Sequence, residues 1–347
     1  MVYSVIKADL GRNREMILSV WNRNAVSDPE RRYSWVYLQN PAGPPEGWLV
    51  TTLKNGVVGS TGLALRQMSL DERSVWVGQA IDLVVDKDHR TAGPALQLQK
   101  GLIDYVKKSS LSLVYGFPNQ RSDEVLSRAG YKFLGNFQRW TRPLRSGYRV
   151  KGFSGLAIAE KAVSSLLDLT THMLWGNTAI GGREGIKTGT SDQFDSRFDS
   201  LWSTASRNFS IVGDRGSTFL KWRFQACPER NYRIFWAANA KEELLGYVVF
   251  TDQGEFTSIS DLLFSNIGVL DILLPEFIHY IRLEGKSAIS MNYLGSDRVT
   301  KKLREYGFFK RSHPIRVLVY VNGDLIRNSE AVMDRNRWYL TDADKDV

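Results

Sequence analysis

The sequence predicts a mixed α/β protein made of two tandem copies of one domain, each a twisted mixed sheet flanked by helices. Segments with the two-residue period of strands alternate with segments of helical spacing, as in sheets covered by helices. Marker residues of the first half then recur in the same order. Trp35 recurs as Trp222 after 187 residues, and Asp82 recurs as Asp261 after 179. Insertions and deletions in loops would shrink the offset in this way, so we predict a duplication.

The domain limits follow from this repeat and from a change of character after residue 145. A chain of 347 residues is longer than most single cores, so two domains are expected. We predict a first domain over 1–145, a linker over 146–194 with a helix at 156–174 and a glycine-rich loop, a second domain over 195–325, and a tail over 326–347. The acidic tail either packs on a domain or is disordered.

In the first copy, the signals alternate between strand and helix. Strands are predicted at 2–7, 48–53, 57–65, 73–85, 111–117 and 131–142, and helices at 9–24, from the loop after residue 90 to residue 107, and at 122–128. Lys54-Asn-Gly56 predicts a tight hairpin, and Gly130 a helix C-cap. We expect the strand at 73–85 to bend near Gly78.

Composition limits the kinds of binding partner and of functional site that we expect. The net charge of +9 is spread along the chain without a run of five like charges, so a phosphorylated small molecule fits this distribution at least as well as a nucleic acid does. Cys227 is the single cysteine, and the four histidines lack metal-ligand spacing, so we predict neither a disulfide framework nor a metal site. No signal peptide or membrane span is predicted, and we expect a soluble, cytoplasmic protein.

One loop stands out as a candidate anion site. An apolar strand ends at Val85, and a helical segment begins a few residues later, after Arg90-Thr-Ala-Gly-Pro-Ala95. A small-residue loop that opens a helix can aim free backbone N–H groups at a phosphate. The same residues could also form an ordinary connection. The second copy favours a functional role, because it keeps the strand with Asp261 but lacks such a loop.

The first copy resembles the GNAT superfamily of acyl-CoA N-acyltransferases. The family's cofactor loop, Arg/Gln-x-x-Gly-x-Gly/Ala after a strand, matches Arg90-Thr-Ala-Gly93-Pro-Ala95. A second family pattern, an Asn at a strand end followed by a Gly-aromatic pair, matches Asn119 and Gly130-Tyr131. The duplication is also similar to tandem GNAT-type proteins associated with polysaccharide synthesis and to Fem-type transferases.

This resemblance implies an acyl-CoA co-substrate, acetyl-CoA or another, and a set of residues that bind it. Loop N–H groups would hold the pyrophosphate, and the strand before the loop would pair with the pantetheine arm. The cofactor-binding residues implied are Leu83, Val84, Val85, Arg90, Thr91, Ala92, Gly93, Ala95 and Asn119. Pro94 has no N–H, so this loop offers one donor fewer than the family pattern.

For catalysis, the resemblance implies a carboxylate base on the strand that leads to the loop, and Asp82 is the candidate. Its counterpart Asp261 lies in a copy without the loop, which favours a structural role for this position. The family's acidic Tyr, four residues before the Gly, is replaced by Leu126. A water, Tyr115 or Tyr131 would have to act instead.

The sequence therefore predicts an acyltransferase that moves an acyl group from CoA to a small-molecule amine. The resemblance implies an amine of a nucleotide-linked amino-sugar as the acceptor. Two alternatives stay open: a Fem-like transferase that uses aminoacyl-tRNA, and a non-catalytic module that kept the fold. The second copy is expected not to bind CoA. The oligomeric state is not predicted.

Overall fold

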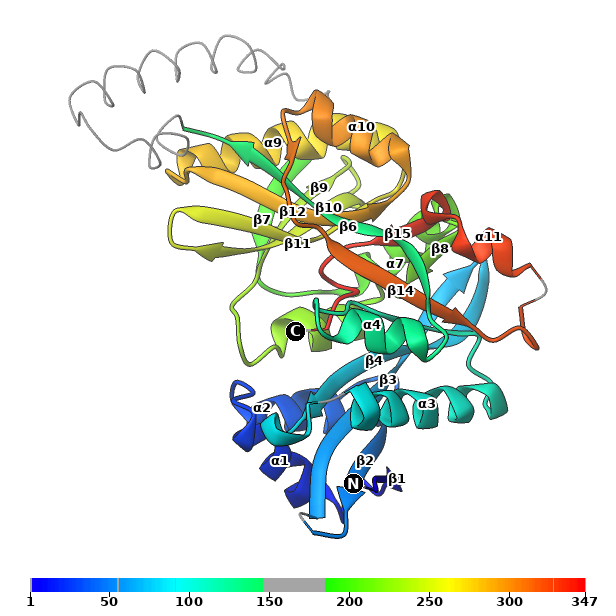
Figure 1. Cartoon of the computed structure of the whole chain (residues 1–347). Coiled ribbons are helices and arrows are strands. Elements are labelled where there is room, and N and C mark those ends of the chain that lie inside the picture. The colour runs from blue at the N-terminus through cyan, green and yellow to red at the C-terminus, as the bar shows by residue number, and fades with distance from the viewer. Residues whose placement is uncertain (1, 55, 91, 146–184, 327, 347) are drawn as a thin grey trace.

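The computed structural model describes residues 2–54, 56–90, 92–145, 185–326 and 328–346 (Figure 1). In chain order, the first half contains β1 (Ser4–Ala8), α1 (Arg14–Arg23), α2 (Pro29–Tyr33), the π-helical turn η1 (Ser34–Leu38), β2 (Glu46–Thr52), β3 (Gly56–Leu70), β4 (Arg73–Val85), α3 (Ala92–Lys108), β5 (Leu113–Gly116), α4 (Ser122–Arg128) and β6 (Lys132–Pro143). The linker helix predicted at 156–174 lies outside the described residues.

The second half follows the same plan. It contains β7 (Lys187–Ser191), α7 (Ser196–Ala205), β8 (Ile211–Gly213), α8 (Ser217–Leu220), the π-helical turn η4 (Lys221–Gln225), β9 (Arg233–Ala238), β10 (Leu244–Gln253), β11 (Phe256–Phe264), α9 (Leu270–Leu283), β12 (Ala288–Gly295), α10 (Asp297–Glu305), β13 (Phe309–Lys310), β14 (Ile315–Val321), α11 (Ser329–Met333) and β15 (Trp338–Leu340). The mixed α/β class with two copies is confirmed.

Strand register shows that the repeat read from the sequence is a repeat in space. Gly59 pairs with Val85 between β3 and β4, and Gly246 pairs with Phe264 between β10 and β11. These are the positions that the two sequence offsets connect. A Cβ atom on Gly59 would lie 2.8 Å from the carbonyl oxygen of Val84, and one on Gly246 would lie 2.8 Å from a carbonyl oxygen of β11. Both copies therefore require glycine for the same close backbone approach.

The two halves exchange the strands that close their sheets. Residues 132–137 of β6 pair with β14, and residues 138–143 of the same strand pair with β12 of the second half. In return, β14 pairs with β5 of the first half. The strand predicted at 131–142 is confirmed, but it closes the sheet of the other copy. Since each exchanged strand covers an edge that would otherwise be open, one continuous sheet runs through the molecule (Figure 1).

A pair of tryptophans joins the halves at the centre. Trp35 and Trp222 occupy the same position in the turns η1 and η4. The indole N–H of Trp35 donates to the carbonyl oxygen of Trp222 at 2.8 Å, and the reverse bond measures 2.9 Å. The two rings stack with centroids 5.3 Å apart. This reciprocal contact is what an approximate two-fold relation between the copies would produce.

The C-terminal segment packs between the halves. Strand β15 lies between β8 and β12, and residues 341–346 continue into the centre of the molecule (Figure 1). Thr341 and Asp344 are fully buried. The sequence left open whether the tail packs on a domain or is disordered. The tail residues that the structure describes are packed against both halves.

Helix α3 shows why the first half folds as predicted. Its apolar residues recur at helical spacing and bury one face against β2, β3 and β4, with Leu98, Leu102, Ile103 and Val106 in the core. Lys107 and Lys108 lie in the last turn, where positive charge complements the helix dipole. Within the described residues, no helix is both long and apolar enough to span a bilayer.

Candidate functional site

A cleft opens where two parallel strands of the first half diverge. Strands β4 and β5 pair only through Gly78 with Val114 and Gln79 with Tyr115. Beyond these pairs β4 continues to Val85, and no strand among the described residues pairs with it on that side. Parallel strands that separate leave backbone N–H and C=O groups free to pair with an extended ligand. The cleft is therefore a groove with one edge of β4 as its wall.

The irregularity in β4 lies at Asp82 and not at Gly78, where the sequence predicted a bend. The register of β3 and β4 shifts between Ser60 and Gly62, and Asp82 has a φ of 51°. A bulge of this kind re-aims the backbone and side chains that follow it. Glycine is required at position 78 for a steric reason, because a Cβ atom there would lie 2.3 Å from a side-chain atom of Leu63.

The residues predicted to bind the cofactor come together around this cleft. A cavity of about 550 Å³ has among its lining residues Leu83, Val84, Val85, Arg90, Ala95 and Asn119. Ala92 and Gly93 begin α3, and Gly93 is exposed. Thr91 lies outside the described residues. Cofactor binding by this set stays a prediction.

The predicted anion site lies at the start of α3, where Ala92 is the first helical residue. The first turn of a helix leaves its N–H groups without intrahelical partners. Pro94 occupies this turn and is buried. It has no N–H group, but an N–H group in the first turn would have no partner within the helix. Arg90 closes the loop: its Nε donates to the carbonyl oxygen of Val85 at 3.0 Å, and its Nη2 to Oδ1 of Asn24 at 2.7 Å.

Asn119 has a clear local role as well. Its Oδ1 accepts the backbone N–H groups of Arg121 and Ser122, at 2.9 and 3.0 Å, and thereby organises the start of α4. An Asx turn of this type explains an asparagine after a strand without any ligand. Asn119 and Ser122 nevertheless line both the cleft and the cavity beside it.

Asp82 lines that second cavity, which has a volume of about 360 Å³. Its Oδ1 lies 2.8 Å from both Nε and Nη2 of Arg32, and its Oδ2 accepts the hydroxyl of Tyr37 at 3.0 Å. The carboxylate is thus held by a guanidinium and a phenol. Asp261 is held in the same way in the second copy, by Arg215 at 3.0 Å and the hydroxyl of Tyr247 at 2.9 Å.

Asp346 is a residue at this site that the sequence did not single out. It lines the same cavity as Asp82 and is half-buried. Burial raises the pKa of Asp346 to about 6; Arg32 opposes this rise, and Asp82 adds to it. The tail was visible as acidic, but no spacing or motif connects position 346 with position 82. Only the path of the tail through the centre brings the two carboxylates together.

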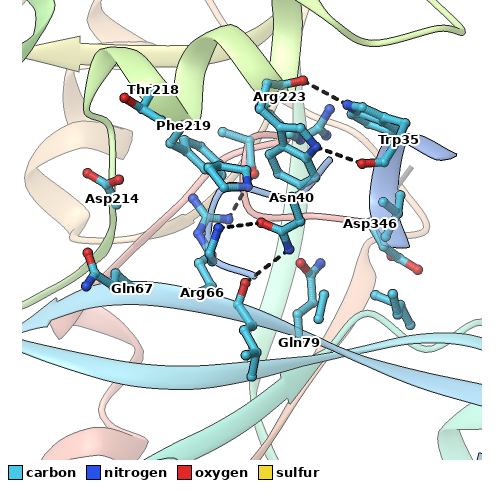
Figure 2. Close-up of a pocket in the computed structure, with 18 of the residues that line it drawn as sticks. Trp35, Asn40, Arg66, Gln67, Gln79, Asp214, Thr218, Phe219, Arg223 and Asp346 are labelled. Carbon is cyan, nitrogen blue, oxygen red and sulfur yellow. Dashed lines mark hydrogen bonds between the residues drawn. The ribbon is translucent and has the colours of Figure 1, made fainter. Parts of the chain in front are cut away.

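A third cavity lies between the halves and has a volume of about 280 Å³ (Figure 2). It shares Arg32, Ile81 and Asp346 with the cavity that contains Asp82, so the two adjoin. Trp35 and Trp222 line this cavity. Tyr33, Tyr37 and Trp48 are instead buried in the hydrophobic cores.

The tyrosines considered as proton donors lie elsewhere. Tyr115 is fully buried beside Arg66, and burial raises its pKa to about 12. The hydroxyl of Tyr131 donates to Oε1 of Gln99 at 3.2 Å, and burial raises the pKa of Tyr131 as well. Neither lines the cleft or the cavity that holds Asp82, whereas Leu126 does.

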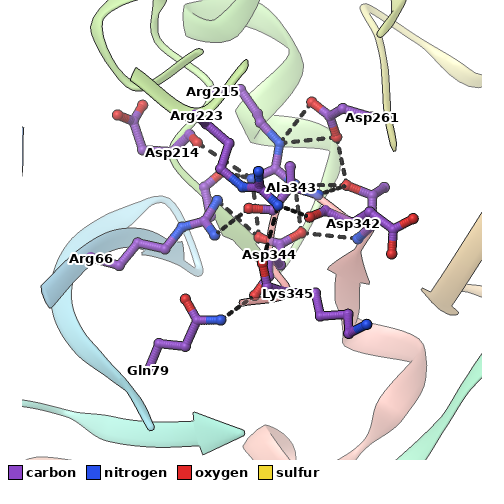
Figure 3. A network of polar contacts seen from close by, with 12 residues as sticks. Arg66, Gln79, Asp214, Arg215, Arg223, Asp261, Asp342, Ala343, Asp344 and Lys345 are labelled. Atoms are coloured by element: carbon purple, nitrogen blue, oxygen red, sulfur yellow. Dashed lines mark hydrogen bonds and ion pairs between the residues drawn. The ribbon is translucent and has the colours of Figure 1, made fainter. Parts of the chain in front are cut away.

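A buried network of charges fixes the tail against both halves (Figure 3). Nη2 of Arg215 lies 2.5 Å from Oδ2 of Asp344, and Nη2 of Arg66 lies 2.9 Å from its Oδ1. Arg215 also binds Asp261. Because Arg66 comes from β3 and Arg215 precedes α8, Asp344 connects the two copies. This explains how the tail can position Asp346 reproducibly.

The second copy differs where the first has its cleft. Val269 and Leu273 approach to within 3.2 Å of the place where a Cβ on Gly246 would lie. Leu270 and Leu273 are fully buried. Apolar side chains of α9 thus pack directly on the sheet. Among the residues that the structure describes, no group of three or more His, Cys, Asp or Glu could hold a metal ion.

Comparison with solved structures defines the class of fold. No family model matches the chain, and a search of curated protein sequences finds no match. A GCN5-related N-acetyltransferase from Anabaena variabilis superimposes with a TM-score of 0.65 at 14% identity, covering 92% of this chain and 73% of that one. A probable N-acyltransferase from Enterococcus faecalis gives 0.66 at 10% identity, covering 93% and 73%.

A more distant similarity concerns a larger enzyme. N-myristoyltransferase from Saccharomyces cerevisiae, solved with bound myristoyl-CoA, gives a TM-score of 0.55 at 12% identity, covering 92% of this chain and 82% of that one. All three neighbours span both halves of the chain. At these identities the comparisons establish the fold, which is that of GNAT-type N-acyltransferases.

Proposed function

We propose that this protein transfers an acyl group from acyl-CoA to an amine. One observation carries the proposal: the open edge of β4, the start of α3 and two carboxylates converge on adjoining cavities. The fold shared with N-acyltransferases supports the same reaction. The pantetheine arm would lie along Leu83 to Val85, and the pyrophosphate would lie at the N–H groups of Gly93 and Ala95.

The reaction needs a proton acceptor and a polar environment, but no covalent intermediate. The amine nitrogen attacks the thioester carbon, the C–N bond forms, the C–S bond breaks, and the CoA sulfur leaves as a thiolate that takes up a proton. A base accepts the proton that the nitrogen loses. The attacking group must be held close to the thioester, which the adjoining cavities would accomplish.

The carboxylates of Asp82 and Asp346 would have different roles in the proton transfer. Asp82 was the candidate base from sequence, and it remains part of the proposed site. Its carboxylate is held in place by Arg32 and Tyr37. We assign the proton transfer itself to the pair, with Asp346 as the member that titrates, since its pKa of about 6 suits a base near neutral pH. Asp82 raises that pKa through its negative charge.

The first experiment measures acetyl-CoA binding by calorimetry for the wild type and for Gly93→Asp. A carboxylate at the exposed Gly93 would face the pyrophosphate, so binding should fall below detection. Gly323→Asp is the matched control, because a side chain there meets no atom within 4 Å and lies in a distant turn. If the wild type binds no acyl-CoA, the proposed function is wrong. If binding survives Gly93→Asp, the pyrophosphate lies elsewhere.

The second experiment follows the pH dependence of kcat/KM through release of the CoA thiol. Activity should rise with pH as Asp346 loses its proton, with a midpoint near 6. Asp346→Asn should abolish this rise. Asp82→Asn removes the charge that raises the pKa and frees Arg32, so the midpoint should move to lower pH. If neither substitution changes the pH profile of kcat/KM, the carboxylate pair is excluded as the base.

The acceptor class expected from the family resemblance, a nucleotide-linked amino-sugar, belongs in the same assay. Stacking surfaces such as Trp35 and Trp222 suit a sugar ring, which supports its inclusion. Aminoacyl-tRNA is the donor that a Fem-like transferase would use instead. Acyl transfer from aminoacyl-tRNA, together with no binding of acyl-CoA, would favour that alternative.

A further inference from the structure

A groove between the exchanged strand β6 and helix α10, here called the β6–α10 groove, lies apart from the proposed acyl-transfer site (Figure 1). Its volume of about 760 Å³ is within the range of small-molecule sites. Residues of β6 come from the first half, whereas α10, Lys310 of β13 and the end of β12 come from the second. The groove shares no lining residue with the cavities of Asp82 and of the proposed cofactor residues.

Helix α10 contributes two cations to this groove. Lys301 and Arg304 lie one turn apart on the face that lines the groove, and both are exposed. Among the described residues, neither of them forms an ion pair with a carboxylate. Lys302 does not line the groove, and it pairs with Asp271 at 2.7 Å and with Glu305 at 3.0 Å. The lysine on the other face is thus neutralised, whereas the two cations in the groove are not.

A third cation is held in the groove by an aromatic ring. Lys310 is paired with Trp140 across strands β13 and β6. Its Nζ lies 5.6 Å from the centroid of the Trp140 ring, and Cζ of Arg304 lies 5.4 Å from the same centroid. A cation–π contact orients a cation, but it brings no negative charge as an ion pair would. Lys310 is exposed, and it has no carboxylate partner in the part of the chain that the structure describes.

The other two charged residues of the lining neutralise each other. Arg335 lies 3.3 Å from a carboxylate oxygen of Asp297. The net charge of the lining is therefore that of Lys301, Arg304 and Lys310. Cations that converge in one groove without counter-charges repel one another and raise the local concentration of anions. This arrangement favours an anionic ligand.

The number and kind of the cations define the chemistry of that ligand. A carboxylate carries one charge and would leave two of the three cations uncompensated. Phosphate suits both kinds of side chain, because arginine donates to it in a bidentate manner and lysine acts as a point charge. Two adjacent phosphate groups carry on the order of three negative charges near neutral pH. A nucleic acid binds through a longer row of cations than this lining offers.

We propose that the β6–α10 groove binds a small molecule with two adjacent phosphate groups. Arg304 and Lys310 would contact the phosphates above the ring of Trp140, and Lys301 would contact them from the neighbouring turn of α10. Since the walls come from both halves, the ligand would also stabilise the exchange of strands. The groove shares nothing with the acyl-transfer site, so this inference does not depend on the proposed function.

The test measures binding of pyrophosphate and of inorganic phosphate by calorimetry, at low ionic strength and without divalent cations. Pyrophosphate should bind the wild type at least about tenfold more tightly, because it engages a further charged donor. Arg304→Gln and Lys310→Gln should each weaken pyrophosphate binding by a similar factor. Arg298→Gln is the matched control, because Arg298 is an exposed arginine of the same helix that does not line the groove. No binding of pyrophosphate, or equal losses in Arg304→Gln and Arg298→Gln, would overturn the proposal.

A variant that deletes no cation covers the case in which Arg304→Gln loses its packing on Trp140 and fails to fold. Asn136 lines the β6 wall of the groove and is exposed, so Asn136→Asp adds a negative charge there with little change of shape. It should weaken binding of pyrophosphate several-fold. Unchanged binding of pyrophosphate to Asn136→Asp would count against the site.

The start of α3 is itself a proposed pyrophosphate site, so Gly93→Asp is titrated in parallel. Pyrophosphate binding that survives Gly93→Asp and is lost in Arg304→Gln belongs to the groove. Binding that is lost in Gly93→Asp and survives Arg304→Gln belongs to the loop and refutes the groove. Failure of acetyl-CoA to bind would refute the proposed function and leave these titrations unaffected. If a short single-stranded oligonucleotide binds more tightly than pyrophosphate, and Arg304→Gln abolishes this binding, the groove belongs to a nucleic acid and the proposal fails.

Discussion

Two neighbouring aspartates of the tail should respond in opposite ways to the same substitution. Asp344 is fully buried between Arg215 and Arg66. Burial alone would raise the pKa of Asp344, but the two guanidinium groups outweigh it and hold the pKa below the usual 3.8. Asp342 is also surrounded by protein, but its partner is the neutral amide of Asn292, at 3.1 Å from each oxygen. Burial raises the pKa of Asp342.

The magnitudes follow from these partners. Removal of one member of a buried ion pair costs about 3–5 kcal/mol, because the remaining charge is left without compensation. Asp344→Asn strands Arg66, whereas Arg215 keeps Asp261, so we expect a loss of about 3 kcal/mol, the lower end of that range. Asp342→Asn removes a charge that burial disfavours and keeps an acceptor for Asn292. Its free energy of unfolding should be unchanged or slightly higher than that of the wild type.

The pH dependence of stability should also have opposite signs for the two aspartates. Because the pKa of Asp344 is lowered on folding, its contribution to stability is present above 3.8 and is lost only in stronger acid. The cost of Asp344→Asn should therefore stay constant between pH 5 and 8. Because the pKa of Asp342 is raised, its ionisation destabilises the fold as the pH rises through that pKa. The advantage of Asp342→Asn should therefore grow towards neutral pH.

Urea unfolding of both variants and of the wild type, followed by tryptophan fluorescence at several pH values, provides the measurement. Each variant differs from the wild type by one oxygen replaced with NH₂, two residues apart on the same segment. If Asp342→Asn destabilises the protein as much as Asp344→Asn, the tail responds to any change of packing. The account based on charge pairing would then be refuted.

Two further predictions concern the repeat. Trp222→Phe removes the indole N–H that donates to Trp35, and Trp35→Phe removes the reciprocal donor. Each variant should lower the free energy of unfolding in urea by about 1 kcal/mol. Because the two rings also stack, the loss in the double variant should differ from the sum of the two single losses. A strictly additive double variant would show that the pair is not a unit. Gly59→Ala and Gly246→Ala each place a Cβ 2.8 Å from a carbonyl oxygen, so both should lower Tm by similar amounts. Only Gly59→Ala should weaken acetyl-CoA binding, since its neighbour Val85 lines the cleft; an equal effect of Gly246→Ala would contradict this assignment.

Much of the fold could be predicted because local patterns and a repeat supported each other. The helix at 122–128 was predicted to the residue, and Gly130 has the positive φ, 106°, that a C-cap requires. The equivalence of Asp82 and Asp261 followed from offsets alone. Strand pairing was harder to predict. Periodicity identifies β6 as a strand, but no local property of this strand states that its partners belong to the other copy.

The site was predictable only in part, and for a related reason. The proposed cofactor residues lie close in sequence, between 83 and 119, so a loop motif and a strand end suffice to find them. Asp346 reaches the site only through tertiary structure, because the tail runs back between the two halves.

The exchange of β6 and β14 has a consequence for how the protein is made. Strand β14 pairs with β5, a partner about 200 residues earlier in the chain, so the first copy emerges from the ribosome with the edge of β5 exposed. It can be completed only after nearly all of the second copy has been synthesised. We therefore expect residues 1–145, expressed alone, to aggregate, and co-expression with residues 185–347 to rescue them as a complex. In a gene built by duplication, such an exchange makes the two halves dependent on each other, because neither could be lost without exposing the edge of the other.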